Sequence, residues 1–190
     1  MKYGRGGPLR RRWWRRRCGV WVVMNNIILI GMPGSGKTRF GEELARVLER
    51  PFYDADRCLE MWEKRSVTEI FSIYGEKVFR DAETRTLRRL SAAREAVIAS
   101  GGGAILRPAN RLILRKAGCV CWIDRSPEEI ARDIVTEGRP LLQEGKQRLW
   151  TLYRERRELY ARCSHVRIRN DSSFEEVLAC MAAVIKERER

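Results

Sequence analysis

The 190-residue chain has a single histidine, no cysteine pair spaced C-x-x-C and no long apolar run near its N-terminus. His165 and the scattered cysteines lack zinc-ligand spacing, so the sequence predicts no zinc site. The six cysteines suggest no disulfide framework, and we expect reduced thiols in a cytoplasmic protein. The apolar stretch CGVWVV has six residues, which is too short for a cleaved signal or a membrane span.

Acidic residues are absent from positions 1–23, which carry eight basic ones. The net charge of the chain is +14, and without this segment 31 basic residues face 25 acidic ones, a net charge of +6. Three tryptophans interleave with the arginines, which is typical of an arm that binds nucleic acid or acidic membrane. The alternative is an extension that is disordered or not native, because MNNIILIGMPGSGKT suits the start of a domain. We expect the latter, with one domain at 24–190.

After residue 24, short apolar runs alternate with amphipathic segments. Strands are expected at 27–30, 52–56, 96–100, 119–124 and 165–169. Helices are expected at about 37–49, 57–64, 66–93 with a joint at Gly75, 108–116, 126–136, 146–161 and from 173 onward. This alternation predicts an α/β protein with three αβα layers and a five-stranded parallel sheet. Ligands of such folds bind at the carboxyl ends of the strands.

The segment GMPGSGKT at 31–38 matches the phosphate-binding pattern G-x-x-x-x-G-K-T, after a strand and at the start of a helix. Backbone N–H groups and the helix N-terminus bind phosphates, while Lys37 neutralises the β and γ oxygens. Thr38 offers a hydroxyl to Mg²⁺. The motif predicts ATP with Mg²⁺ as phosphate donor and leaves the acceptor open. The nucleotide contacts expected here are Gly34, Ser35, Gly36, Lys37, Thr38 and Arg39.

The segment FYDAD places Asp54 and Asp56 two residues apart after a strand, so their side chains are expected to converge. One aspartate would support the Mg²⁺ water shell, and the other would position an acceptor hydroxyl or take its proton. Capping of the next helix by Asp56 explains the pattern equally well.

Three further segments carry candidate site residues. Arg80 and Glu83 share a helix face, a spacing that in isolation favours a solvated ion pair. The glycines at 101–103 follow a strand, where they suit close approach to a ligand or a tight connection. Arg139, between Gly138 and Gly145, suits a mobile lid that stabilises charge on the γ-phosphate and excludes water. Of the arginines at 154, 156 and 157, at least two are expected on a solvated face.

Together, GSGKT, FYDAD, IFSIYGEKVFRDAE, SGGGAI, GRPLL and RRELY resemble the shikimate kinase family within the nucleoside-monophosphate-kinase-like P-loop folds. The resemblance runs from about 25 to 185. It implies that Asp56 binds the shikimate hydroxyls and acts as catalytic base. It also implies that Asp54, through water, and Thr38 support Mg²⁺, and that Arg80 and Arg156 pair with the shikimate carboxylate.

The resemblance assigns further roles. Glu83 orients Arg80, and Arg139 covers the phosphates from a lid at about 136–147. Arg132 stacks on adenine. The glycines expected to contact shikimate through their backbone are Gly101, Gly102 and Gly103. The expected catalytic residues are Lys37, Asp56 and Arg139.

Two positions depart from the family pattern. Glu158 replaces the usual proline before the LY pair, which puts Arg156 in question. Lys64 replaces a glycine, which we interpret as a surface change. The charged positions that the family needs are all retained.

The implied activity is transfer of the γ-phosphate of MgATP to the 3-hydroxyl of shikimate, in chorismate biosynthesis. We expect a cytoplasmic monomer with shikimate as small-molecule partner, no need for nucleic acid, and no membrane. The alternatives are another small-molecule P-loop kinase such as gluconate kinase, a nucleotide-dependent binding module that uses the basic segment, or a non-catalytic shikimate binder.

Overall fold

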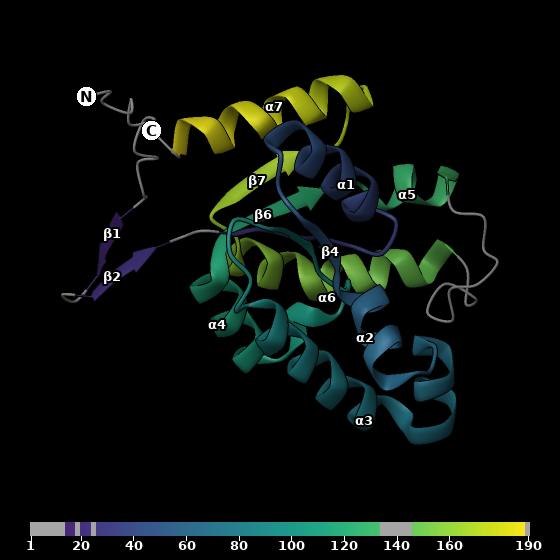
Figure 1. Cartoon of the computed structure of the whole chain (residues 1–190). Coiled ribbons are helices and arrows are strands. Elements are labelled where there is room, and N and C mark those ends of the chain that lie inside the picture. Colours follow the sequence, from purple (N-terminus) through teal and green to yellow (C-terminus); the bar gives the residue numbers. More distant parts are fainter. Residues whose placement is uncertain (1–13, 18–19, 24–25, 134–145, 189–190) are drawn as a thin grey trace, which may run out of the picture.

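The computed structural model describes residues 14–17, 20–23, 26–133 and 146–188. A five-stranded parallel sheet with the order β4-β5-β3-β6-β7 lies at the centre of the domain (Figure 1). The strands are β3 (Asn26–Ile30), β4 (Phe52–Asp54), β5 (Val97–Ala99), β6 (Gly118–Asp124) and β7 (Val166–Arg169). The predicted parallel sheet of five strands is therefore confirmed.

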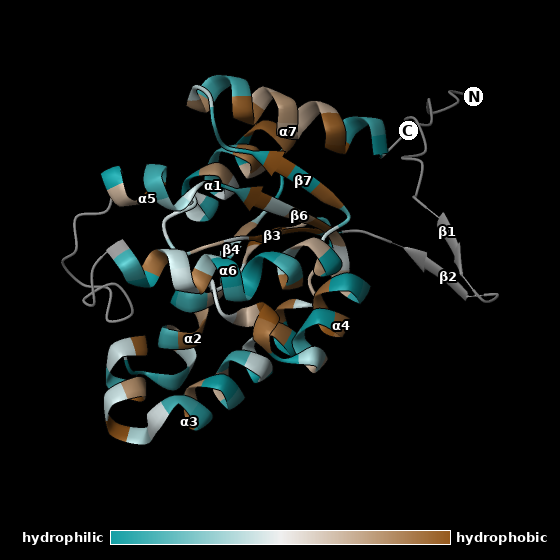
Figure 2. Ribbon diagram, turned by 180° about the vertical axis from the view of Figure 1, so that it is seen from behind, coloured by the Kyte–Doolittle hydropathy of each residue, from teal (hydrophilic) through white to brown (hydrophobic). Residues whose placement is uncertain are grey.

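Helices cover both faces of this sheet, as Figure 1 shows. All five residues of β3 are buried, and successive side chains enter opposite layers. Ile27 and Leu29 pack with α1 (Lys37–Leu48) and α7 (Phe174–Arg188). Ile28 and Ile30 pack on the other side with α3 (Val67–Leu90), α4 (Pro108–Ala117) and α6 (Lys146–Cys163). In Figure 2 brown, hydrophobic residues are prominent on the strands, while the helices carry both brown and teal residues along their length.

Helices α2 (Ala55–Glu63) and α3 form a smaller unit at the end of β4. Helix α3 begins with a capping box, in which the Ser66 hydroxyl accepts from the Glu69 N–H and the Glu69 carboxylate accepts from the Ser66 N–H. Gly75 interrupts the helix with φ 78° and ψ 171°, a conformation that favours glycine, and so forms the predicted joint. Residues of both helices form a separate apolar cluster that contains Leu59, Ile70, Phe79 and Ala82.

Most element boundaries agree with the prediction to within a few residues, and the differences have local causes. The strand expected at 52–56 is β4, and it ends at Asp54 because the Asp54 carboxylate caps α2. Asp56 therefore lies inside that helix. Helix α3 ends at Leu90, three residues early. The short 3₁₀ helix η1 (Ala104–Leu106) was not predicted. Helix α5 spans Pro127–Asp133, which agrees with the helix expected from 126 as far as the description extends.

Part of the basic N-terminal segment forms two strands that the sequence did not predict. Strands β1 (Trp14–Arg17) and β2 (Val20–Val23) pair antiparallel in a two-stranded sheet of their own. This hairpin stands apart from the five-stranded sheet in Figure 1. None of the helices in the described ranges is long and apolar enough to cross a membrane. The described cysteines, at 58, 119, 121, 163 and 180, form no disulfide with one another.

Candidate active site

A cavity of about 700 Å³ opens at the carboxyl ends of β3, β4 and β5. The loop after β3, the loop after β5 and the facing sides of α2 and α3 line it. The parallel sheet therefore brings together segments that are widely separated in the sequence. The predicted site residues that line this cavity are Gly34, Gly36, Lys37, Thr38, Arg39, Asp54, Asp56, Arg80, Glu83, Gly101, Gly102 and Gly103.

The phosphate loop connects β3 to α1 and lies at one end of the cavity. Its lysine is buried, and the Lys37 ammonium donates to the carbonyls of Gly31 at 2.9 Å and Met32 at 2.7 Å. The Asn170 amide donates to the Ser35 carbonyl at 3.0 Å, so the segment after β7 also holds this loop. Gly36 has φ 93° immediately before α1, which turns the loop into the helix. The loop and the helix N-terminus thus form the expected anion-binding geometry.

Thr38 and Asp54 lie in direct contact across the start of α1 and the end of β4. The Thr38 hydroxyl donates to Asp54 Oδ2 at 2.7 Å, while Asp54 Oδ1 accepts from the backbone N–H groups of Asp56 and Arg57. Asp54, rather than Asp56, is therefore the helix cap. Hydroxyl and carboxylate oxygens are ligands that Mg²⁺ prefers, and this ion usually keeps several of its waters. The oxygen pair therefore fits the predicted metal-supporting role.

Asp56 lies two residues further on, in the first turn of α2, and lines the same cavity as the phosphate loop and α3. Burial raises its pKa, and the neighbouring Asp54 carboxylate raises it further, whereas the positive charges of Lys37 and Arg80 oppose this shift. A carboxylate with a raised pKa is a better proton acceptor while it remains ionised. The position of Asp56 on the cavity wall and its raised pKa fit the predicted role of proton acceptor.

Arg80 contacts two carboxylates on its own helix. Its Nη1 atom donates to Glu83 Oε2 at 3.0 Å, and its Nε and Nη2 atoms each lie 3.2 Å from Glu76 Oε1. Arg80 and Glu83 are both buried, so the expected ion pair is present but is not solvated. Burial raises the pKa of Glu83, while Arg80 acts in the opposite direction. The Glu76 side chain is 61% exposed, so a ligand carboxylate can replace it on the Nε–Nη2 edge.

The three glycines after β5 lie against both sides of the site. A Cβ atom on Gly101 would lie 2.8 Å from Asp56 Oδ1, and one on Gly102 would lie 2.6 Å from Pro33 Cδ of the phosphate loop. A Cβ atom on Gly103 would overlap the guanidinium of Arg80. The backbone of the triplet therefore lies close to side chains of the phosphate loop, α2 and α3, while its contact with a ligand stays a prediction.

Arg156 is buried behind this triplet, where its Nη1 atom donates to the Gly102 carbonyl at 3.3 Å. Its Nε atom is inaccessible and has no partner among the described residues. Arg156 itself does not belong to the described lining of the cavity. Arg154 and Arg157 are exposed, as expected for two of these three arginines.

The departure at position 158 leaves α6 intact. Glu158 points to solvent, where its carboxylate accepts from Arg162 Nε at 2.9 Å, one turn along the helix. Helix α6 continues without interruption to Cys163, and Arg156 stays on its buried face. Lys64, the other departure, is exposed at the end of α2.

The remaining residues predicted on the nucleotide side differ in where they lie, and their contacts with ATP stay predictions. Ser35 is fully buried in the phosphate loop, and Arg39 lies exposed with its guanidinium 4.1 Å from the centre of the Phe174 ring. Arg132 is exposed on the last turn of α5 and is not part of the described cavity lining. Arg139 lies outside the described residues, as does the predicted lid except for 146–147, which belong to α6.

Sequence reasoning missed several residues of this site. Phe71 and Phe79 form an apolar wall, with ring centroids 5.1 Å apart, on either side of the Gly75 joint. Their position beside Arg80 on a kinked helix was a usable signal. Tyr160 was also missed, although its hydroxyl donates to the Gly102 carbonyl at 2.6 Å. Besides Phe71 and Phe79, the lining residues that were not predicted are Pro33, Arg57, Glu60, Val67, Thr68 and Ser100.

These features define the class of protein: a three-layer αβα kinase fold with a phosphate loop and a second binding region beside it. A sequence model of the family described as "Shikimate kinase" matches residues 33–186. A curated shikimate kinase from Symbiobacterium thermophilum is 43% identical over 169 residues, which cover 86% of this chain and 97% of that protein. The chain therefore belongs to the shikimate kinase family.

Solved structures agree with this assignment. A shikimate kinase from Acinetobacter baumannii in complex with shikimate is 31% identical, with a TM-score of 0.82 over 87% of this chain and 96% of its own. A gluconokinase from Sinorhizobium meliloti is 18% identical, with a TM-score of 0.52 over 87% of this chain and 98% of its own. This second likeness shows a shared fold alone. The family assignment thus favours shikimate kinase over the gluconate kinase alternative.

Proposed function

We propose that this protein transfers the γ-phosphate of ATP to the 3-hydroxyl of shikimate, giving shikimate 3-phosphate and ADP. The observation that carries the proposal is the joint lining of one cavity by the phosphate loop, Asp56 and the buried Arg80–Glu83 pair. A phosphate donor and a small acidic acceptor can then lie side by side in it. Such positioning, together with electrostatic stabilisation, accounts for most of the catalysis in phosphoryl transfer.

Arg80 is the first carboxylate-binding group in this proposal. Glu83 holds one side of its guanidinium, and the contact with the exposed Glu76 already presents a carboxylate oxygen to the other side. A guanidinium binds carboxylates by paired N–H donors, so shikimate can take the place of Glu76 there. Arg156 is the second cation in this proposal, and its contact with the Gly102 carbonyl places its guanidinium directly behind the glycine triplet.

Asp56 is the group that fixes and deprotonates the acceptor hydroxyl. It contacts the region of Gly101 and lies within the electrostatic influence of both Lys37 and Arg80. It therefore lies where the donor and acceptor regions of the cavity meet. Since phosphoryl transfer is largely dissociative, Asp56 contributes by orienting the hydroxyl as well as by taking its proton. Gly101, Gly102 and Gly103 complete the acceptor side through their backbone.

On the donor side, Lys37 and the backbone N–H groups at 34–39 bind the phosphates. Mg²⁺ would neutralise negative charge on the donor phosphates, and the residues that would hold it are Thr38 and, through water, Asp54. Arg132 and Arg139 retain their predicted roles, on adenine and over the phosphates. We also propose that the protein acts as a cytoplasmic monomer and, because both substrates are small molecules, that it needs no nucleic acid.

A coupled assay of ADP release tests the activity, with shikimate, gluconate or no acceptor present. We expect ADP release that depends on shikimate, while gluconate gives only the rate seen without acceptor. ADP release that does not respond to shikimate would refute the proposal. Light scattering in the same buffer tests the monomer, and deletion of residues 1–23 tests whether the basic segment contributes to the activity.

A further inference from the structure

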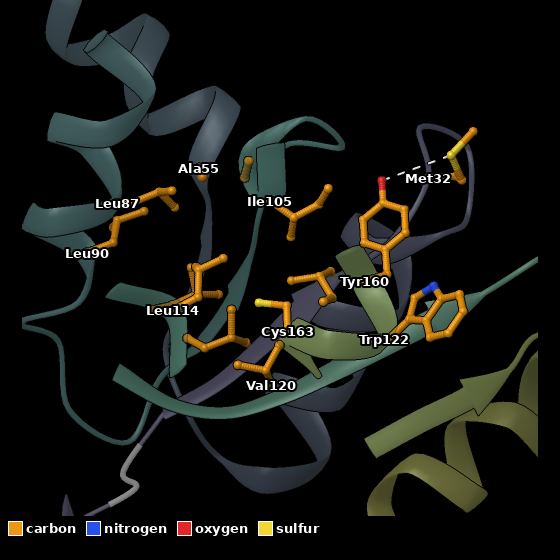
Figure 3. Packing of buried hydrophobic residues seen from close by; sticks show 14 of the residues in the cluster. Met32, Ala55, Leu87, Leu90, Ile105, Leu114, Val120, Trp122, Tyr160 and Cys163 are labelled. Carbon is orange, nitrogen blue, oxygen red and sulfur yellow. Dashed lines mark hydrogen bonds between the residues drawn. The ribbon is translucent and has the colours of Figure 1, made fainter. Parts of the chain in front are cut away.

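Tyr160 connects three parts of the site without lining the cavity. It is fully buried on α6, and its ring stacks on Trp122 of β6 with centroids 5.9 Å apart. Figure 3 shows its hydroxyl pointing toward Met32 of the phosphate loop, at 4.0 Å from the sulfur. The same hydroxyl donates a short hydrogen bond of 2.6 Å to the Gly102 carbonyl. One side chain thus links α6, the glycine triplet and the phosphate loop.

The Gly102 carbonyl is a shared acceptor. Tyr160 donates to it at 2.6 Å, and Arg156, one helical turn earlier on the same face of α6, donates at 3.3 Å. The shorter bond comes from the neutral hydroxyl, so the carbonyl does not depend on the charged group for its hydrogen bond. A buried carbonyl without a good donor costs free energy, and a nearby guanidinium would then be drawn to it.

We propose that Tyr160 is a positioning residue for shikimate binding, which keeps Arg156 available for the shikimate carboxylate by satisfying the Gly102 carbonyl. The tyrosine hydroxyl also anchors the middle glycine of the triplet, which lies directly against Pro33. Without the Tyr160 hydroxyl, the Arg156 guanidinium becomes the sole donor to the Gly102 carbonyl and is held there. The backbone of the glycine triplet, which contacts the acceptor, also loses an anchor. The phosphate loop keeps its own hydrogen bonds from Lys37 and Asn170, so ATP binding is spared. This inference rests on the proposed transfer to shikimate.

The chain offers a matched control for this test. Tyr153 lies two turns earlier on α6, and its hydroxyl donates to Asp124 Oδ1 at 3.1 Å, away from the glycine triplet. Tyr160→Phe and Tyr153→Phe each remove one hydroxyl from the same helix and keep the ring. A general loss of helix stability would affect both variants, whereas an effect through Gly102 would affect only the first.

Steady-state kinetics on both variants, with shikimate and ATP varied separately, show whether the KM for shikimate changes while the KM for ATP does not. We expect Tyr160→Phe to raise the KM for shikimate about fivefold to tenfold, as for loss of one buried neutral hydrogen bond. Its KM for ATP and both KM values of Tyr153→Phe should change by less than about twofold. A double-mutant cycle with Arg156→Lys should show clear non-additivity in the KM for shikimate.

Three outcomes would overturn the proposal: equal increases in both KM values of Tyr160→Phe, the same changes in both tyrosine variants, or additive effects in the cycle. Thermal denaturation measures whether Tyr160→Phe still folds. A variant that does not fold would also contradict the proposal, since Tyr160 would then act through core packing. Failure of the unchanged protein to use shikimate would instead refute the proposed function, so the two failures are distinguishable.

Discussion

The donor and acceptor regions of the cavity are built in different ways. The phosphate loop is one continuous segment at 31–38, held by hydrogen bonds from Lys37 to carbonyls five and six residues away. The acceptor region takes Asp56 from α2, Arg80 and Glu83 from α3, and three glycines from the loop after β5, with Arg156 of α6 behind them. The donor region can therefore be recognised from a short motif, while the acceptor region exists only after the sheet has formed.

The two regions also handle charge differently. Donor binding relies on a lysine, backbone N–H groups and a helix N-terminus. In the proposed function, acceptor binding relies on buried arginines that already have carboxylate or carbonyl partners, such as Arg80 with Glu83 and Arg156 with Gly102. A buried charge needs such partners, and these partners restrict the directions in which it can bind a ligand. The acceptor region should therefore be more sensitive to side-chain geometry than to charge alone.

The largest expected effect comes from Asp56, where the two regions meet. Asp56→Asn removes the proton acceptor but keeps nearly the same shape. We expect kcat to fall by roughly 10²- to 10⁴-fold, as for loss of a general base. Single-turnover measurement of phosphate transfer, with ATP binding measured separately by calorimetry, checks this. A fall below tenfold would mean that Asp56 orients the hydroxyl without taking its proton.

Lys37→Met tests whether the donor region is independent of the acceptor region. We expect kcat to fall by roughly 10²- to 10³-fold, because one electrostatic contact to the transferring phosphate is lost. Shikimate binding to the same variant, measured by calorimetry, should stay within about twofold of the unchanged protein. Lys77→Met, at an exposed position of α3, is the control. A loss of shikimate affinity in Lys37→Met as large as the fall in kcat would contradict the independence of the donor and acceptor regions.

Arg80→Lys tests the importance of geometry in the acceptor region. The variant keeps a positive charge beside Glu83 but loses the paired donors of a guanidinium. We expect the KM for shikimate to rise by about tenfold, with the KM for ATP little changed. Arg85→Lys is a matched control, because Arg85 lies on the same helix and pairs with Glu63 at the exposed surface. Similar KM values for shikimate in Arg80→Lys and the unchanged protein would contradict a bidentate contact.

The smallest expected effect is on the pH dependence. Burial raises the pKa of Asp56 above the usual 3.8, so Asp56 takes up a proton at a higher pH than an ordinary aspartate. Because only the ionised form accepts the proton of the hydroxyl, kcat/KM for shikimate should fall as the pH is lowered through this raised pKa. A pH–rate profile measures this acid limb. It should be absent from the residual activity of Asp56→Asn, and a limb that persists there would point to Glu83, whose pKa burial also raises.

Much of the fold followed from periodicity, because β3, β5 and β6 are short apolar runs and the strands of the main sheet alternate with amphipathic helices. The errors arose where a local side chain overrode the pattern, as when Asp54 capped α2 and ended β4. Of the site, the phosphate loop followed from its own residues. The other positions were ambiguous by spacing alone, since Arg80 and Glu83 fitted a solvated pair and Asp56 fitted a helix cap. Only the resemblance to the family assigned them roles.

The sequence by itself determined the alternation of strands and helices, the phosphate-binding loop and the joint at Gly75, because these depend on contacts between residues close in the chain. The tertiary structure alone decided that Arg80 and Glu83 are buried together, that Arg156 rather than its neighbours faces inward, and that Tyr160 holds Gly102. These features depend on which helix face meets the sheet and on loops brought together at the strand ends. No local pattern encodes such distances, since they arise only when the parallel sheet packs against its helices.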